Sequence, residues 1–253
     1  MPQDLNFSMP ARRRMFTKML AISAVASPAM IGLSVPTVSF AASLSQAQRD
    51  QMTPDDVIDR FRAGNLRFRE NRSAKHDYLA QKRASSAGQF PAAVILSCID
   101  SRVPAEIILD AGIGETFNSR VAGNVSNADV LGSMEFSCAS AGAKAVVVMG
   151  HSACGAVKGA IANAQLGNLT GLLAKIKPAI DQTDYAGARS PDNYDFVDAV
   201  ARKHIELTIQ DIRAKSPVLK GLETDGQIRI VGAFYQFKGG RVEFFDVAPH
   251  PPL

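Results

Sequence analysis

The stretch AAVILSCIDSRV, residues 92–103, joins a short apolar run to a group of polar and reactive side chains. Its first six residues are rich in branched side chains, which is typical of a strand buried on both faces of a sheet. Cys98, Asp100 and Arg102 then follow at every second position, where this strand is expected to end. A lone cysteine at such a place is more often a small apolar residue than a ligand.

Similar patterns along the chain predict the other elements of the domain. Strands are expected at residues 115–121, 145–149, 227–237 and 241–247, and helices at 53–70, 128–141, 152–164 and 192–215. The alternation of strands and helices predicts an α/β fold. We expect a mainly parallel central sheet of four strands with an antiparallel edge strand and helices on both faces. Ligands of such sheets bind at the carboxyl ends of the strands.

The first 41 residues are expected to form an export signal, and residues 42–253 a single domain. Basic residues at 12–14 and 18 precede an apolar stretch from about 19 to 35, and Ser39-Phe40-Ala41 has the small-x-small pattern of a cleavage site. The string RRMFTK, residues 13–18, resembles a twin-arginine signal, which implies a periplasmic or otherwise exported bacterial protein. A membrane anchor is the alternative, but the interrupted apolar run is short for a span. We expect cleavage after Ala41 and no stable membrane span afterwards.

The composition supports one globular domain and argues against a nucleic-acid partner. The chain has 253 residues, 46% of them hydrophobic and 21% charged, and a net charge of +4. Residues 1–41 contain four basic residues and one acidic residue, a net +3, so the remaining chain carries only about +1. It has no basic stripe interleaved with aromatic residues, which nucleic-acid binding would require.

The stretch MGHSACGAVKGA, residues 149–160, places His151 and Cys154 three residues apart after the third predicted strand. With Cys98 at the end of a neighbouring strand, they make a set of two thiolates and one imidazole. This set suits a tetrahedral zinc ion with one open position, as in catalytic zinc sites. The sequence thus favours one zinc ion per chain, and a disulfide between Cys98 and Cys154 is the alternative. Cys138 is most simply a buried thiol.

The motifs CIDSRV, residues 98–103, and GHSACG, residues 150–155, closely resemble those of the β-class carbonic anhydrases. Further matches at 114–117, 120–124 and 131–135 extend the resemblance over most of residues 50–247. The resemblance implies that Cys98, His151 and Cys154 bind zinc, with water or hydroxide in the fourth position. It also implies that Asp100 and Arg102 form the catalytic dyad of the family.

The charges of these residues agree with that assignment. Two thiolates neutralise a zinc ion, so direct binding of Asp100 would leave the site anionic and closed to water. Arg102 is always protonated and is suited to hold the carboxylate away in a bidentate pair. The implied activity is reversible hydration of carbon dioxide to bicarbonate and a proton, by attack of zinc-bound hydroxide. Hydrolysis of carbonyl sulfide or carbon disulfide, or a zinc-stabilised binding protein without turnover, are the alternatives.

The resemblance also implies a substrate pocket and an oligomer. Gln89 matches a glutamine that binds bicarbonate in one subgroup of the family, whereas the other subgroup has a tryptophan there and an inhibitory bicarbonate site. The chain has no tryptophan, so we expect no such inhibitory site. The other expected pocket residues are Phe117, Ala122, Gly123 and Phe136, the last of which replaces a tyrosine of some members. The family forms dimers, so we expect a homodimer or tetramer with residues 53–70 as the amino-terminal arm.

Overall fold

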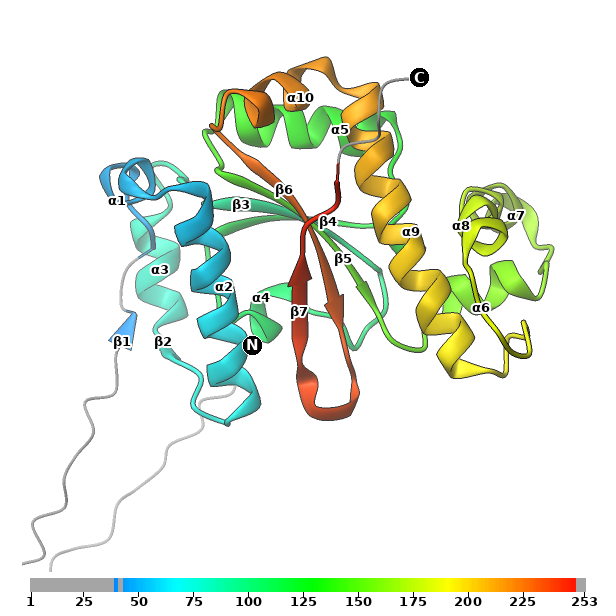
Figure 1. Cartoon of the computed structure of the whole chain (residues 1–253). Coiled ribbons are helices and arrows are strands. Elements are labelled where there is room, and N and C mark those ends of the chain that lie inside the picture. Colours follow the sequence, from blue (N-terminus) through cyan, green and yellow to red (C-terminus); the bar gives the residue numbers. More distant parts are fainter. Residues whose placement is uncertain (1–38, 41–42, 249–253) are drawn as a thin grey trace, which may run out of the picture. The chain divides into compact units, whose positions relative to one another are not determined.

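A computed structural model of the chain describes residues 39–40 and 43–248 (Figure 1). The predicted basic and apolar parts of the export signal, and Ala41 at the expected cleavage position, lie outside these residues. Among the residues described, none of the helices combines the length and the apolar character that a membrane crossing requires.

The core of the domain is a five-stranded sheet in the order β4 (Thr116–Arg120), β3 (Ala93–Ser97), β5 (Ala145–His151), β6 (Arg229–Tyr235) and β7 (Val242–Phe245). The first four strands are mutually parallel, and β7 pairs with β6 in the antiparallel direction. Every residue of β3 and β5 is buried, which explains why β3 is apolar up to Leu96 and β5 up to Gly150, without polar residues in alternation. The predicted fold class is therefore confirmed.

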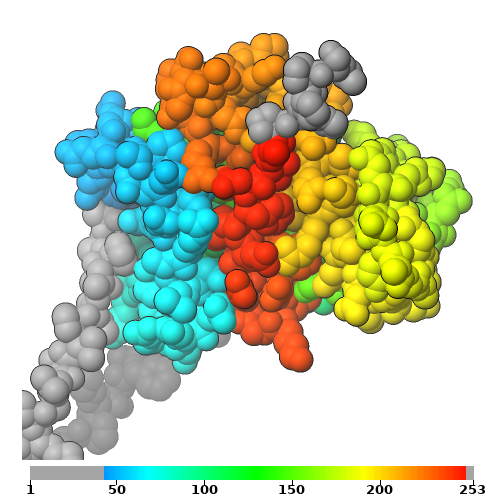
Figure 2. Space-filling view, viewed as in Figure 1, coloured from blue at the N-terminus to red at the C-terminus, as the bar shows by residue number. Residues whose placement is uncertain are grey.

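Helices cover both faces of this sheet. On one face α2 (Pro54–Arg69) and α4 (Ala105–Ile108) pack against Ala93 and Ile95 of β3. The opposite face packs Val94 and Leu96 against a larger group of helices. These include α5 (Ala128–Glu135), α9 (Tyr194–Lys215) and α10 (Pro217–Thr224). Figure 2 shows the red β7 segment exposed between the cyan α2 and the gold α9.

The remaining described elements are short. They are β1 (Ser39–Phe40), α1 (Gln46–Gln51), β2 (Lys75–His76), α3 (Tyr78–Ala84), η1 (Ala122–Asn124), η2 (Phe136–Ser140), α6 (Gly155–Ile161), α7 (Gly167–Ala174), α8 (Lys177–Gln182) and η3 (Lys238–Gly240). The helix predicted at 128–141 is α5 followed by the π-helical turn η2. The helix predicted at 152–164 begins only at Gly155, because Ala153 has a φ of 53° and interrupts the helical path.

The predicted arm helix packs on its own chain. Thr53 caps α2 by accepting from the Asp56 amide, and the Asp56 carboxylate accepts from the Thr53 amide in return. Buried Asn65 donates from Nδ2 to the Gly240 carbonyl at 2.9 Å and accepts from the Val242 amide at 2.9 Å. These bonds join α2 to the β6–β7 connection.

We predict that His204 makes the free energy of unfolding depend on pH. This α9 residue is 5% exposed, and burial lowers its pKa from 6.5 to about 4. Between these values the unfolded chain binds a proton that the folded chain does not, so stability rises from pH 4 to 6.5, by up to about 3 kcal/mol. Denaturant unfolding at several pH values should show this rise. In His204→Asn, the free energy of unfolding should rise less over the same pH range, by that amount. Parallel curves for the two proteins would contradict the assignment.

Candidate metal centre

The three predicted zinc ligands meet at the carboxyl edge of the sheet. Cys98 follows the last residue of β3, His151 is the last residue of β5, and Cys154 directly precedes α6. Because Ser97 pairs with Met149, the two strands end side by side. One ligand atom from each of the three residues lies within 4.8 Å of the others, and all three residues are buried. One zinc ion, with Zn–S near 2.3 Å and Zn–N near 2.0 Å, fits among such atoms with small adjustments.

The hydrogen bonds of His151 leave one ring nitrogen available for a metal. Its Nδ1 donates to the carbonyl of Ser152 at 2.9 Å, which places the lone pair on Nε2. Nε2 is buried and has no hydrogen-bond partner. A buried acceptor without a partner is costly, and metal coordination satisfies it. The donor set therefore fits zinc. All three cysteines of the chain are free, so the predicted alternative of a Cys98–Cys154 disulfide is not formed.

The two thiols share a proton in a way that favours metal binding. A hydrogen bond from Cys154 stabilises the Cys98 thiolate and lowers the pKa of Cys98 to about 4. The Gly123 amide also donates to Cys98 Sγ, at 3.3 Å. Cys154 keeps the shared proton, so its pKa is raised by the neighbouring Cys98 and by burial. Zinc requires both sulfurs as thiolates, so binding would release this proton.

Asp198, which sequence reasoning missed, and Gly123, which was predicted only as a pocket residue, hold the backbone around the ligands. The Ala153 amide, in the turn between His151 and Cys154, donates to Asp198 Oδ1 on α9 at 2.8 Å. Burial raises the pKa of Asp198, and the hydrogen bond from the Ala153 amide offsets part of this rise. On the other side, Gly123 has a φ of 65°, and a Cβ there would come within 2.8 Å of Ile176 Cδ1. Glycine adopts this left-handed backbone conformation without strain, and in it the Gly123 amide reaches Cys98 Sγ.

Asp100 and Arg102, the residues of the predicted dyad, form a bidentate ion pair. Arg102 donates from Nε to Asp100 Oδ1 at 2.9 Å and from Nη2 to Oδ2 at 2.7 Å, and its amide donates to Oδ1 at 3.0 Å. The hydrogen bonds from the Arg102 side chain hold the pKa of Asp100 well below its usual range. Asp100 Oδ2 lies 4.0 Å from His151 Nε2. The carboxylate is therefore ionised, adjacent to the ligand set and fastened to the arginine.

Arg120 fixes the main chain that carries the dyad. It donates from Nε to the Cys98 carbonyl at 3.0 Å and from Nη2 to the Asp100 carbonyl at 2.6 Å. Since Arg120 is the last residue of β4, it ties the segment after β3 to the next strand of the sheet. The sequence matched Arg120 to the family motif but did not reveal this role.

Phe237, in the connection after β6, touches both the dyad and a metal ligand, and sequence reasoning also missed it. Its ring centroid lies 4.1 Å from the guanidinium carbon of Arg102 and 5.2 Å from the His151 ring. Its amide donates to Ser152 Oγ at 2.9 Å, which docks the connection on the ligand turn. A ring over a guanidinium attracts the cation, so Phe237 restrains an otherwise exposed arginine.

The predicted pocket residues fall into two groups. Ala122 and Gly123 in η1 lie beside Cys98. Gln89 is exposed and precedes β3, so the whole strand, about 16 Å at 3.3 Å per residue, separates it from Cys98. Phe117 pairs with Val94 in the register of the sheet, and its ring lies 6.0 Å from that of Phe136. Within one chain, Gln89, Phe117 and Phe136 thus lie away from the ligands.

The protein has an α/β fold, with a Cys-His-Cys group that could hold a metal ion at the carboxyl edge of its parallel strands. The family model described as carbonic anhydrase matches residues 93–242, more than half of the chain. The chain is 36% identical over 192 residues to "Carbonic anhydrase 2" of Mycobacterium tuberculosis, covering 74% of this chain and 90% of the relative. It is 30% identical over 218 residues to "Carbonic anhydrase" of Pseudomonas aeruginosa, covering 78% and 94% of the two chains.

The chain is also similar in fold to a carbonic anhydrase whose structure has been solved. The crystal structure of the β-carbonic anhydrase CafA of Aspergillus fumigatus is similar with a TM-score of 0.59 and 28% identity, covering 66% of this chain and 80% of that one. The chain therefore belongs to the β-class carbonic anhydrases, enzymes that hydrate carbon dioxide.

We predict that Phe237→Leu loosens Arg102 without removing the metal. Loss of a cation–π contact worth about 0.5–1 kcal/mol should shift the Arg102 conformers two- to fivefold. The Arg102 Nε–H resonance in ¹⁵N NMR should then exchange faster with solvent, at unchanged zinc content. Phe244→Leu is the matched control, since that ring lies 5.7 Å from the Arg62 guanidinium carbon. An unchanged Arg102 resonance in Phe237→Leu would show that the ring does not restrain the dyad.

Proposed function

We propose that the chain catalyses the reversible hydration of carbon dioxide to bicarbonate and a proton, with one zinc ion held by Cys98, His151 and Cys154. The observation that carries the proposal is the position of Asp100. Its carboxylate lies 4.0 Å from the unpartnered Nε2 of His151, yet both of its oxygens are engaged by Arg102. Membership of the carbonic anhydrase family supports the same reaction.

Zinc bound at these residues would supply a Lewis acid that makes a water molecule acidic enough to attack carbon dioxide near neutral pH. Asp100 accepts the hydrogen bond of the attacking O–H group, so that the lone pair of that oxygen is turned towards the carbon of the substrate. The carboxylate serves only as an acceptor here, because Arg102 keeps its pKa far below neutral pH.

Arg102 has a second task in this proposal. Two thiolates already balance the charge of a zinc ion, and a third anionic ligand would block the position that the reaction needs. The bidentate pair with Arg102 turns both oxygens of Asp100 away from that role. The guanidinium is held in place by the Phe237 ring on one side.

We predict that Asp100→Asn lowers the turnover number for carbon dioxide hydration by about a hundredfold, the size of effect typical of a positioned proton acceptor. Zinc content, measured by atomic absorption, should remain at one ion per chain. Asp181→Asn is the control, because this exposed carboxylate pairs only with Lys177 at the surface. Full activity in Asp100→Asn would refute the proposed role.

Assays with carbonyl sulfide and carbon disulfide, in parallel with carbon dioxide, separate the proposed reaction from the alternative hydrolase activities, since the ligand set suits all three. A zinc-bound protein that turns over none of them would be the non-catalytic binding protein. The hydrase proposal requires that carbon dioxide be the preferred substrate.

The proposal includes a homo-oligomer, in which the β4 edge of one chain faces a second copy. β4 is an edge strand of the sheet, and Phe136, 54% exposed, lies beside it against Phe117. An aromatic side chain exposed next to an open strand edge favours association. Such packing would bring Phe117, Phe136 and Gln89 of one chain towards the metal centre of its partner, where the family places its substrate pocket.

We predict that Phe136→Glu yields a monomer by light scattering, because a buried carboxylate at the interface would lack a partner. Its hydration activity should fall while zinc is retained. Leu166→Glu is the matched control, since Leu166 is 70% exposed, lies in the connection between α6 and α7, and should leave the oligomer intact. An unaltered oligomer in Phe136→Glu would place the interface elsewhere.

We further propose that the enzyme is exported and acts in the periplasm or beyond it. The support is the sequence of residues 1–41, with its paired arginines, apolar stretch and small-x-small pattern. Removal of these residues would leave an amino terminus close to Ser43, which donates from its hydroxyl to the carbonyl groups of Gln81 and Ile113.

A further inference from the structure

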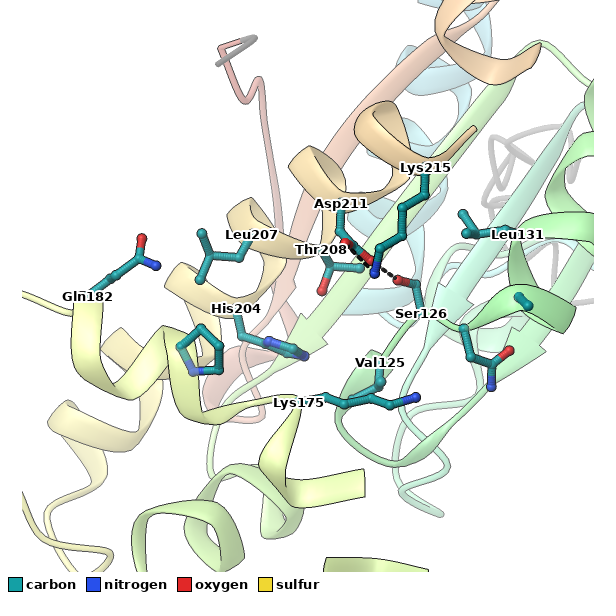
Figure 3. A pocket seen from close by; sticks show the side chains of 13 residues that line it. Val125, Ser126, Leu131, Lys175, Gln182, His204, Leu207, Thr208, Asp211 and Lys215 are labelled. Carbon is teal, nitrogen blue, oxygen red and sulfur yellow. Dashed lines mark hydrogen bonds and ion pairs between the residues drawn. The ribbon is translucent and has the colours of Figure 1, made fainter. Parts of the chain in front are cut away.

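A cavity of about 750 Å³ lies among the helices that cover the α9 face of the sheet, between the start of α5, α8 and α9 (Figure 3). The proposed reaction at the metal centre does not use it. Its walls combine charged, hydrogen-bonding and apolar side chains, which is the usual composition of a binding site for a small organic molecule.

The charged groups of the cavity leave one positive charge unbalanced. Lys215 pairs with Asp211 at 2.7 Å, and Ser126 Oγ donates to the other oxygen of the same carboxylate at 2.9 Å. Figure 3 shows this network at one side of the cavity and Lys175 extending across the other. Lys175 has no ion pair among the described residues, so its ammonium group is available to a monoanion.

His204 supplies a hydrogen-bonding group at the floor of the cavity. Its ring points in between Val125 and Lys175 (Figure 3), and its Nε2 is buried without a hydrogen-bond partner. Burial lowers the pKa of His204 to about 4, and a hydrogen bond to the backbone of Gly123 opposes this effect only in part. The imidazole is therefore neutral near pH 7. Because Nε2 has no partner, the ring donates to Gly123 through Nδ1, and Nε2 of the neutral ring is an acceptor without a donor.

Apolar side chains form the rest of the lining, namely Val125, Leu131, Pro178 and Leu207. An inorganic anion would leave these apolar surfaces in contact with water. A ligand that matches the lining carries one negative charge for Lys175, one hydroxyl donor for His204 and a short hydrocarbon part.

We propose that this cavity binds a small organic monoanion with a hydroxyl group, of the 2-hydroxycarboxylate class, between Lys175 and His204. The site is separate from the metal centre, and the inference does not rest on the proposed activity. The two sites are adjacent, however, because Gly123 hydrogen-bonds to the His204 ring and its amide donates to Cys98 Sγ at 3.3 Å. The backbone amide resonance of Gly123 should therefore respond to changes at the cavity and at the metal centre.

The test is an NMR titration of the purified zinc-containing protein with three matched probes. L-lactate has the charge and the hydroxyl, propionate lacks the hydroxyl, and methyl lactate lacks the charge. We expect L-lactate to bind about fivefold more tightly than propionate, the value of one hydrogen bond, and about tenfold or more tightly than methyl lactate. Amide shifts should include residues 123–127 and 204–211.

Variants distinguish this site from binding of the carboxylate at the metal. Lys175→Met should weaken L-lactate binding about tenfold, whereas Lys177→Met, two residues further along the chain but paired with Asp181, should leave it unchanged. His204→Phe should remove the preference for L-lactate over propionate. Lys175 is exposed, so its variant tests the proposal even if His204→Phe fails to fold.

Equal binding of L-lactate to Lys175→Met and to the unaltered protein would overturn the proposal and would place the ligand at the metal centre. Equal affinities for L-lactate and propionate would overturn the role of His204. Neither result would affect the hydration reaction proposed for Asp100 and the zinc ligands, so the two proposals fail independently.

Discussion

The parallel pairing of β3 with β5 is the constraint on which the metal centre depends. The two strands are in register over five residue pairs, from Ala93 with Ala145 to Ser97 with Met149. Cys98 leaves the end of one strand while the other continues to His151, and the tight turn that follows brings Cys154 back to the same point. A shift of one residue in this register would turn a ligand to the opposite face of the sheet, because side chains alternate along a strand. The buried apolar cores on both faces make such a shift costly.

Charge balance explains the residues around the ligands. Two sulfurs and a carboxylate lie close together in a largely buried place, which is unfavourable unless cations and amide dipoles compensate. Arg102 compensates Asp100, while the Gly123 amide donates to Cys98. Arg120 donates to the main-chain carbonyl of Cys98, and the Phe237 ring packs against the Arg102 guanidinium. These contacts therefore keep the Asp100 carboxylate ionised and fix its orientation.

Much of the architecture was predictable from local patterns. The continuous apolar runs at 92–97 and 145–149 correspond to β3 and β5, and the Thr53-Pro54-Asp55-Asp56 stretch starts α2 as expected. These elements could be predicted because a helix start depends on neighbouring residues, and a buried strand depends on the apolar character of its whole segment. The residues that were missed, Asp198 and Phe237, lie 44 and 83 residues beyond Cys154. No local pattern relates a helix carboxylate or a loop aromatic ring to a ligand turn so distant in the chain.

The sequence by itself predicted the Cys-His-Cys group and its placement at strand ends, because these depend on side-chain chemistry and short spacing. The pairing of Asp100 with Arg102 was implied by the resemblance of the CIDSRV motif to the family. Only the tertiary structure decided which predicted pocket residues accompany them within one chain. Ala122 and Gly123 lie at the carboxyl edge with Cys98, whereas Gln89, Phe117 and Phe136 do not. The physical reason is the direction of the strands. Residues before β3 and in the first half of β4 lie towards the opposite end of a parallel sheet, however close they are to Cys98 in the chain.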